Sequence, residues 1–336
     1  MLSQWSRLLI LTRLLLASCQ LETKQNPIHA PWGPRGASTP QGFSHCLFYD
    51  DFSDRRPGSL PSPSKWTLDL GTSYPGGPER WGTGELQTYT NDEANIRITP
   101  RNTLKITPIR HANGTWTSSR IETTARWDWG CRTGRRRVRA EARIRLGDDP
   151  KSKQLGIWPA FWALGSEFRG NFWNWPGIGE VDIMESLNGE SKVWNVVHCG
   201  FAPGGPCDEF NGVSSATEGI SRGEWHVFAF DIHCPTRRCG SNGSMSWYID
   251  GNPRQTLTYP DVKNASAWNA LVENKKMLLL NVAVGGGFPD GVAGFKTPTN
   301  ATAGGDGASM EVDYVAVWEQ RWQSGSPRER CIFESL

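Results

Sequence analysis

The sequence has no excess of charge of one sign: it holds 36 Lys and Arg residues and 34 Asp and Glu residues, for a formal net charge of +2. A nucleic-acid-binding chain needs surplus cations to displace counterions from phosphates, so nucleic acid is not an expected partner. Beyond Ala17 no segment offers the roughly 18 uncharged apolar residues that a membrane span needs. No repeat of roughly 20–50 residues is present either. These absences argue against nucleic-acid-binding, multi-span membrane and repeat proteins.

Turn residues and indoles are what the chain has in excess. The 37 Gly and 22 Pro residues make up about 18% of the chain, against a usual ~12%. Such a composition favours short strands joined by turns over long helices. The 17 Trp residues, against 6 Tyr, indicate either an aromatic core or a surface that stacks on flat ligands.

The chain begins like an exported protein. A basic start, a short apolar run and small residues at its end predict a secretory signal peptide over residues 1–19. Arg13 interrupts the apolar run, so an uncleaved signal anchor is the competing interpretation. We expect a flexible lead-in over residues 20–45, one domain over residues 46–320 and a tail over residues 321–336, which lacks the hydrophobic stretch of a lipid-anchor signal.

Glycosylation acceptors and cysteines point to the same compartment. Four N-x-Ser/Thr acceptors occur, and together with eight cysteines they favour a secreted, extracellular protein: Asn113, Asn242, Asn264 and Asn300. The spacings suggest the cysteine pairs Cys199–Cys207, Cys234–Cys239 and Cys46–Cys331, with Cys131 left free, although spacing alone does not fix connectivity. A zinc site is the alternative, drawn from His198, Cys199, Cys207, His233 and Cys234.

The clearest strand is Arg137–Leu146, in which apolar residues take the even positions and charged residues take every odd position. This alternation is typical of a strand with one solvated face. Its arginines could form a polyanion site, but a solvated sheet face is the favoured interpretation. Further strands are expected over residues 103–108, 224–231, 245–250, 277–284 and 310–319. Short strands in such number predict an all-β sandwich of two sheets.

The segment Gly179–Ser186 (GEVDIMES) carries three acids. Glu180 and Asp182 alternate with apolar residues and therefore share one face of a strand. Strict alternation would turn Glu185 to the other face, but a β-bulge near Ile183–Met184 adds one residue and returns Glu185 to the acidic face. No Lys or Arg occurs between Arg169 and Lys192 to neutralise these carboxylates.

An exposed edge strand with protective charges is one explanation of the acidic segment. Like charges on one face weaken a sheet, however, and the segment is flanked by Trp, Phe and further Trp residues from Trp158 to Trp194. Indoles that stack on sugar rings beside paired carboxylates are what cleavage of a glycosidic bond requires. Three acids on one curved strand favour the short carboxylate spacing of a retaining enzyme.

The motifs resemble glycoside hydrolase family 16, and within it the laminarinase-like branch of secreted fungal endo-β-1,3(4)-glucanases. The resemblance rests on Gly156–Gly165 (GIWPAFWALG) followed by Gly179–Ser186, whose E-x-D-x-x-E spacing differs from the unbulged E-x-D-x-E of lichenases and transglycosylases. It extends in unbroken order over about residues 47–319, through Phe48–Phe52, Trp81–Thr90, Thr117–Thr123, Val197–Cys199, Leu280–Gly286 and Glu311–Trp318.

This resemblance implies a β-jelly roll with a concave substrate cleft and a retaining mechanism. By motif position, Glu180 corresponds to the nucleophile, Glu185 to the general acid/base and Asp182 to the acid that tunes the nucleophile. The resemblance also implies a set of substrate-binding residues: Trp158, Trp162, Trp175, Arg120, His198 and Asn281. His198, on the next expected strand, would face the same cleft if it pairs beside Glu185.

Two features depart from the family pattern or extend it. Around Glu85 the chain has Thr-Gly-Glu where many relatives have Asn-Asn-Glu, which leaves the outer subsites undefined. Several relatives bind a structural calcium, for which Asp50, Asp51 or Asp313 could supply oxygen ligands; no catalytic cofactor is expected.

The predicted function is endo-hydrolysis of β-1,3-linked or mixed β-1,3/1,4 glucan by a monomer. Two alternatives remain open on the same fold. A non-catalytic β-glucan-binding recognition protein would typically lack one or both glutamates. A cell-wall transglycosylase would transfer the glycosyl group to another sugar, which the bulged motif disfavours.

Overall fold

The computed structural model describes residues 37–131, 135–236 and 239–321. The predicted signal peptide, most of the lead-in and nearly all of the tail lie outside the described residues, so these assignments stay predictions. No helix among the described residues has the length and apolar character needed to cross a membrane.

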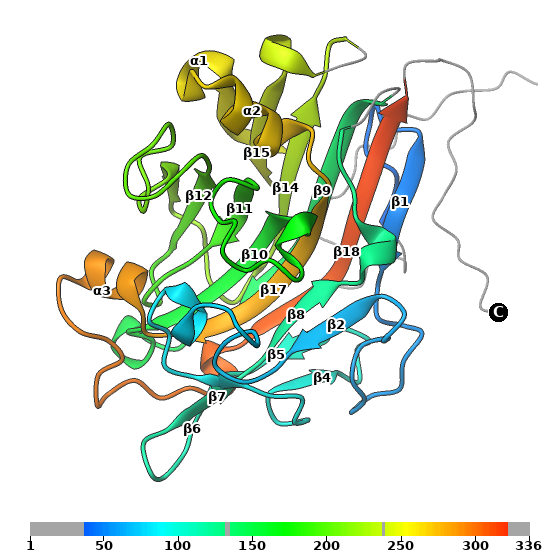
Figure 1. Ribbon diagram of the computed structural model, residues 1–336. Coiled ribbons are helices and arrows are strands. Elements are labelled where there is room, and N and C mark those ends of the chain that lie inside the picture. The colour runs from blue at the N-terminus through cyan, green and yellow to red at the C-terminus, as the bar shows by residue number, and fades with distance from the viewer. Residues whose placement is uncertain (1–36, 132–134, 237–238, 322–336) are drawn as a thin grey trace, which may run out of the picture. The chain divides into compact units, whose positions relative to one another are not determined.

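Two large antiparallel sheets form the domain (Figure 1). The seven-stranded sheet has the order β13 (Val213–Glu218), β12 (Lys192–His198), β11 (Glu180–Glu185), β10 (Ile157–Gly165), β17 (Lys276–Val284), β8 (Arg120–Thr123) and β2 (Trp66–Asp69). The eight-stranded sheet has the order β16 (Asn252–Thr258), β15 (Ser244–Ile249), β14 (Trp225–His233), β9 (Arg135–Leu146), β18 (Met310–Arg321), β5 (Leu104–Ile106) and β4 (Ile96–Ile98), with β1 (His45–Asp50) paired to β18.

Smaller elements complete the described residues. A three-stranded sheet joins β3 (Thr88–Tyr89), β7 (Trp116–Ser118) and β6 (Ile109–Arg110). The helices are short: α1 (Tyr259–Val262), α2 (Ala265–Val272) and α3 (Gly287–Ala293). Single 3₁₀ turns cover Glu79–Gly82, Ala125–Trp127, Lys151–Lys153, Ser166–Phe168, Gly240–Asn242 and Asp306–Ala308. The predicted all-β sandwich is thus confirmed.

The arginine-rich strand β9 behaves as its alternation predicts. Its even residues, such as Val138 and Ile144, are fully buried in the core, while its arginines lie on the outer face. There they pair with acids of neighbouring strands: Arg139 with Asp231 of β14, and Arg143 with Asp313 of β18 at 2.8 Å. The run is therefore an ion-paired sheet face rather than an open cationic surface.

Between the two sheets lies one large hydrophobic core. Residues of β9, β14, β15 and β18 pack against residues of β10, β11 and β17, and Trp247 of β15 is fully buried among them. The indole Nε1 of Trp247 donates a hydrogen bond to the carbonyl oxygen of Asp182 at 2.9 Å. The eight-stranded sheet, called the outer sheet below, thus bonds directly to the backbone of the acidic strand β11.

Two of the predicted disulfides are present, Cys199–Cys207 and Cys234–Cys239. They exclude the alternative zinc site, because all three of its proposed sulfur ligands, Cys199, Cys207 and Cys234, are bonded to other sulfurs. Cys331 lies outside the described residues, so its pairing with Cys46 stays a prediction.

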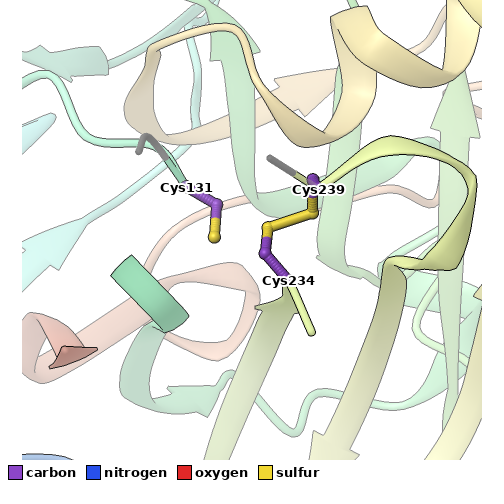
Figure 2. Close-up of side chains that lie close together, drawn as sticks. All are labelled: Cys131, Cys234 and Cys239. Carbon is purple, nitrogen blue, oxygen red and sulfur yellow. A yellow bond between two sulfur atoms is a disulfide. The ribbon is translucent and has the colours of Figure 1, made fainter. Parts of the chain in front are cut away.

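Cys131 is a buried free thiol, as predicted. Figure 2 shows its sulfur directed toward the Cys234–Cys239 disulfide, and the three sulfurs lie within 4.8 Å of one another. Burial raises the pKa of the Cys131 thiol to about 12, so it stays protonated and is a poor nucleophile toward the neighbouring disulfide.

The carboxylates considered for calcium already have partners. Asp50 is buried, and it accepts hydrogen bonds from Lys65 Nζ at 2.8 Å and from Trp66 Nε1 at 2.7 Å. Asp51 accepts from the backbone and hydroxyl of Ser53, and Asp313 pairs with arginine. Asp50 is thus already matched by a cation and an N–H donor, while a calcium ion at Asp51 or Asp313 stays a prediction.

The strand that carries the acids lies inside its sheet, between β10 and β12. The alternative of a charged edge strand is therefore wrong. The predicted bulge is present: on β12, Val196 lies opposite Asp182 and Trp194 opposite Glu185, so two residues of β11 face the single residue Asn195. The register with β10 breaks at the same point.

A bulge leaves backbone groups outside the ladder, and side chains satisfy them here. Asn195 is fully buried, and its Nδ2 donates to the carbonyl oxygen of Ile183 at 2.7 Å. Together with the Trp247 bond to Asp182, this provides partners for two successive carbonyls of the bulge. The phase of β11 is thus fixed by side chains from β12 and β15.

We predict that Asn195→Ala lowers the free energy of unfolding by about 1–3 kcal/mol, because it leaves the buried Ile183 carbonyl without a donor. Urea denaturation followed by tryptophan fluorescence measures the change. Ser214→Ala, on an exposed position of the adjacent strand β13, is the matched control and should differ by less than about 0.5 kcal/mol. Equal stability of the two variants would contradict this account of the bulge.

Candidate active site

The bulge divides β11 into an apolar and an acidic face. Val181, Ile183 and Met184 belong to the central core. Glu180, Asp182 and Glu185 lie on the opposite face of the strand, together with half-buried indoles of β10. The extra residue of the bulge therefore places Glu185 on the same face as Glu180 and Asp182, as predicted.

Glu185 is buried and bonded to an indole. Trp158 of β10 donates from Nε1 to Glu185 Oε1 at 2.8 Å, which leaves Oε2 to carry a proton. Burial raises the pKa of Glu185 to about 7, against the opposing effect of the Trp158 hydrogen bond and the charge of His198. Near neutral pH this carboxyl group exchanges readily between its acid and base forms.

Glu180 is the more accessible of the two glutamates. Burial raises its pKa, while the charges of His198 and Arg120 and a hydrogen bond from Trp175 favour its carboxylate form. The surroundings of Glu180 thus contain more groups that stabilise negative charge than those of Glu185. Environments that separate two carboxyl groups in this way are typical of an acid and a nucleophile that work as a pair.

Asp182 lies between the two glutamates. Its pKa is raised well above the usual range by burial and by the charges of Glu185 and Glu180. Its Oδ2 is buried and has no hydrogen-bond partner among the described residues. Three carboxyl groups this close do not all ionise at neutral pH, because each charge disfavours the next.

His198 lies on β12, but opposite Glu180 rather than beside Glu185 as expected. The register decides this, because the bulge shifts the pairing so that Trp194 takes the position opposite Glu185. The imidazole Nε2 is 3.6 Å from Asp182 Oδ2, so His198 still joins the acidic group.

Trp162 and Asn281 act as one unit. Trp162 Nε1 donates to Asn281 Oδ1 at 2.8 Å, and Asn281 Nδ2 donates to the Tyr89 hydroxyl at 3.2 Å. Tyr89 in turn donates to Glu85 at 2.8 Å. This buried chain fixes the orientation of a half-buried indole on the acidic face.

Arg120 of β8 is held from several sides. Its Nε bonds to Asp69 at 3.0 Å, and its guanidinium lies over the rings of Trp81 at 4.6 Å and Trp162 at 4.9 Å. These cation–π contacts stabilise the position of the Trp162 indole. The hypothesis that Arg120 also binds sugar hydroxyls stays a prediction.

A second group of aromatic rings adjoins the acids. Trp175 lies 5.5 Å from the His198 ring and stacks on Phe210 with ring centroids 6.1 Å apart. Phe210 is 68% exposed and Phe201 on the same loop is 64% exposed. These neighbouring aromatic rings form a surface on which the flat apolar face of a ligand can stack.

The carboxylate and imidazole atoms of Glu180, Asp182 and His198 lie within 4.8 Å of one another. Metal sites also group such atoms, but here the bulge and the β11–β12 register explain the grouping.

Sequence reasoning missed Glu209, which contacts His198. Its position two residues after Cys207 gave no signal, because the contact depends on how the loop folds.

No protein-family model matches the chain, but individual proteins do. A solved endo-1,3-β-glucanase from Streptomyces sioyaensis is 40% identical, with a TM-score of 0.77, over 85% of this chain and 99% of that one. Glucan endo-1,3-β-glucosidase A1 of Niallia circulans is 28% identical over 298 residues, which cover 82% of this chain but 38% of that protein. Both are bacterial, so the fungal part of the sequence-based assignment stays a prediction.

A β-1,3-glucan-binding protein from Penaeus monodon is also similar, with 29% identity over 250 residues, 60% of this chain and 63% of that one. The match to the Streptomyces structure covers almost all of that enzyme. On this match the chain belongs to glycoside hydrolase family 16, in its endo-1,3-β-glucanase (laminarinase) branch.

Proposed function

We propose that the protein hydrolyses internal bonds of β-1,3-linked or mixed β-1,3/1,4 glucan with retention of configuration. The observation that carries the proposal is the shared face of Glu180, Asp182 and Glu185, created by the bulge in β11. The printed activities of the similar glucanases support the choice of β-glucan as substrate.

In this mechanism Glu185 first acts as an acid. Its carboxyl group, with Oε1 bonded to Trp158, donates a proton to the glycosidic oxygen while Glu180 attacks the sugar carbon from the opposite side. The bond to the leaving sugar breaks and a covalent glycosyl-enzyme forms. Glu185, now a carboxylate, removes a proton from water, which releases the sugar and restores Glu180.

Asp182 tunes the nucleophile in this proposal. Burial and the charges of Glu185 and Glu180 raise the pKa of Asp182 and so favour its protonated form, and a protonated Asp182 can donate a hydrogen bond to the Glu180 carboxylate. That bond would make Glu180 a better leaving group from the glycosyl-enzyme.

The aromatic residues bind the sugar rings. Trp158 and Trp162 lie on β10 beside the acids, and Trp175 extends the aromatic surface toward Phe210. Asn281 and Arg120 hold Trp162, and His198 adjoins the reacting carboxylates. Rings fixed by hydrogen bonds in this way lose little entropy when a sugar stacks on them.

We also propose that the protein is secreted and acts as a monomer. Its two disulfides fit an oxidising compartment. The four glycosylation acceptors Asn113, Asn242, Asn264 and Asn300 all occupy exposed positions.

The similar glucan-binding protein makes a non-catalytic role the second candidate. Incubation with laminarin and measurement of reducing ends separates the two. We expect reducing ends to accumulate with the enzyme; laminarin binding without product would favour the binding protein. Longer oligosaccharides formed from short ones would instead indicate a transglycosylase.

We predict that Glu180→Gln and Glu185→Gln each lower kcat on laminarin by at least about 10³-fold while binding changes little, because each removes a reacting group. Near-normal turnover in either variant would refute its role. Azide assigns the roles: Glu180→Ala should form an α-glycosyl azide and Glu185→Ala a β-glycosyl azide. The reverse pattern would exchange the two assignments.

We predict that kcat/KM falls as the pH rises through about 7, where Glu185 loses the proton that it must donate. The Trp158 N–H stabilises the Glu185 carboxylate, so Trp158→Phe should raise this pKa and move the alkaline limb to higher pH. Trp162→Phe, which keeps a ring but lacks contact with Glu185, is the control. A Trp158→Phe profile that coincides with that of the control would contradict the prediction.

A further inference from the structure

The loop that follows β12 carries a buried carboxylate toward the acidic face. The Cys199–Cys207 disulfide closes this loop, and both cysteines are fully buried. Glu209 comes two residues later, and its side chain has no exposed surface. Backbone hydrogen bonds in both directions between Glu209 and Gly204 fix its position.

Both oxygens of Glu209 have donors. Oε1 accepts from the backbone N–H of Cys199, and Oε2 accepts from His198 Nδ1, each at 2.7 Å. A buried carboxylate is costly unless it is matched by donors or by a cation. One N–H and one imidazolium would provide that match here.

The second nitrogen of the same imidazole points to the acids. His198 Nε2 is 3.6 Å from Asp182 Oδ2, the oxygen that has no hydrogen-bond partner among the described residues. His198 therefore lies between two carboxyl groups, one on each side of the ring. The charged groups that act on this ring or on its partners are Glu180, Asp182 and Glu185 on β11, Glu209 on the loop, and Arg120 on β8.

We propose that Glu209 is a positioning residue that keeps His198 as an imidazolium, with Nε2–H directed at Asp182, so that its charge favours the ionised form of Glu180. The inference rests on the proposed function, because it assigns this charge to the nucleophile of the reaction. Glu209 itself need not touch the sugar; it acts through His198.

The electrostatics agree with the geometry. Burial opposes a charge on His198, but the hydrogen bond that its ring donates to Glu209 and the charges of Glu180 and Glu209 raise its pKa. The charge of His198 in turn lowers the pKa of Glu180, against the effect of burial and against the smaller direct effect of the Glu209 charge, which raises it. A histidine held between carboxylates is thus a cation at a pH where an isolated imidazole is largely neutral.

Glu209→Gln tests the proposal. An amide has one acceptor oxygen, so it cannot accept from both Cys199 N–H and His198 Nδ1, and it lacks the charge. We expect the pKa of His198, measured from the NMR shift of its Cε1 proton as a function of pH, to fall by about one unit or more. The acid limb of kcat/KM on laminarin should move to higher pH, because loss of the imidazolium charge raises the pKa of Glu180 by more than loss of the Glu209 charge lowers it.

Asp208→Asn is the matched control, since it removes one charge from an exposed neighbour in the same loop; neither His198 nor the acid limb should move. His198→Asn is the second variant. It should also move the acid limb to higher pH, and adding Glu209→Gln to it should cause no further rise, because Glu209 favours the Glu180 carboxylate only through the imidazole while its own charge opposes it.

The outcomes separate this proposal from the proposed function. Lower thermal stability of Glu209→Gln with an unchanged His198 titration would make Glu209 merely structural and overturn the inference. A wild-type protein that releases no reducing ends from laminarin overturns the hydrolase. The His198 titration would then still decide whether Glu209 holds the imidazole.

Discussion

The bulge in β11 is the constraint on which the acidic site depends. A strand presents successive side chains to opposite faces. Glu185 follows Glu180 by five steps, so in a regular strand without the bulge the two glutamates would lie on opposite faces. The sheet accepts that residue because Trp247 and Asn195 supply donors to the carbonyls of Asp182 and Ile183. Apolar packing of Val181, Ile183 and Met184 then holds the strand in this phase. The chemistry of the site is thus set by backbone groups on the core side of the sheet.

Burial raises the pKa of all three acids of β11, but their neighbours differ. Glu185 has one indole N–H, Asp182 has only an imidazole near its second oxygen, and Glu180 faces His198 and Trp175. Carboxyl groups of one strand therefore have unequal tendencies to ionise, and this inequality lets one act as acid while another acts as nucleophile. Rigid support of the surrounding indoles, as Asn281 gives Trp162, keeps those tendencies constant.

Much of this was visible in the sequence, because it depends on local pattern. The alternation in Arg137–Leu146 and the one-residue phase shift after Asp182 are properties of neighbouring residues, and two cysteine pairs span short loops. The pairing of His198 with Glu180 was missed because it depends on the register between strands, which the bulge itself alters. Glu209, Trp247 and Asn195 were missed because each acts on a group that folding alone brings near. Motif resemblance identified the acids but not the side chains that support them.

On the far side of the domain, acids of the outer sheet are shared. Asp231 pairs with Arg137 and Arg139, and Glu311 pairs with Arg101 and Arg145. Glu319 likewise forms ion pairs with both Arg135 and Arg321. Loss of one such acid would leave two guanidinium groups without that carboxylate partner at once and would raise the local positive charge of this face. The charge balance of this arginine-rich face therefore depends on a few shared carboxylates rather than on one acid for each arginine.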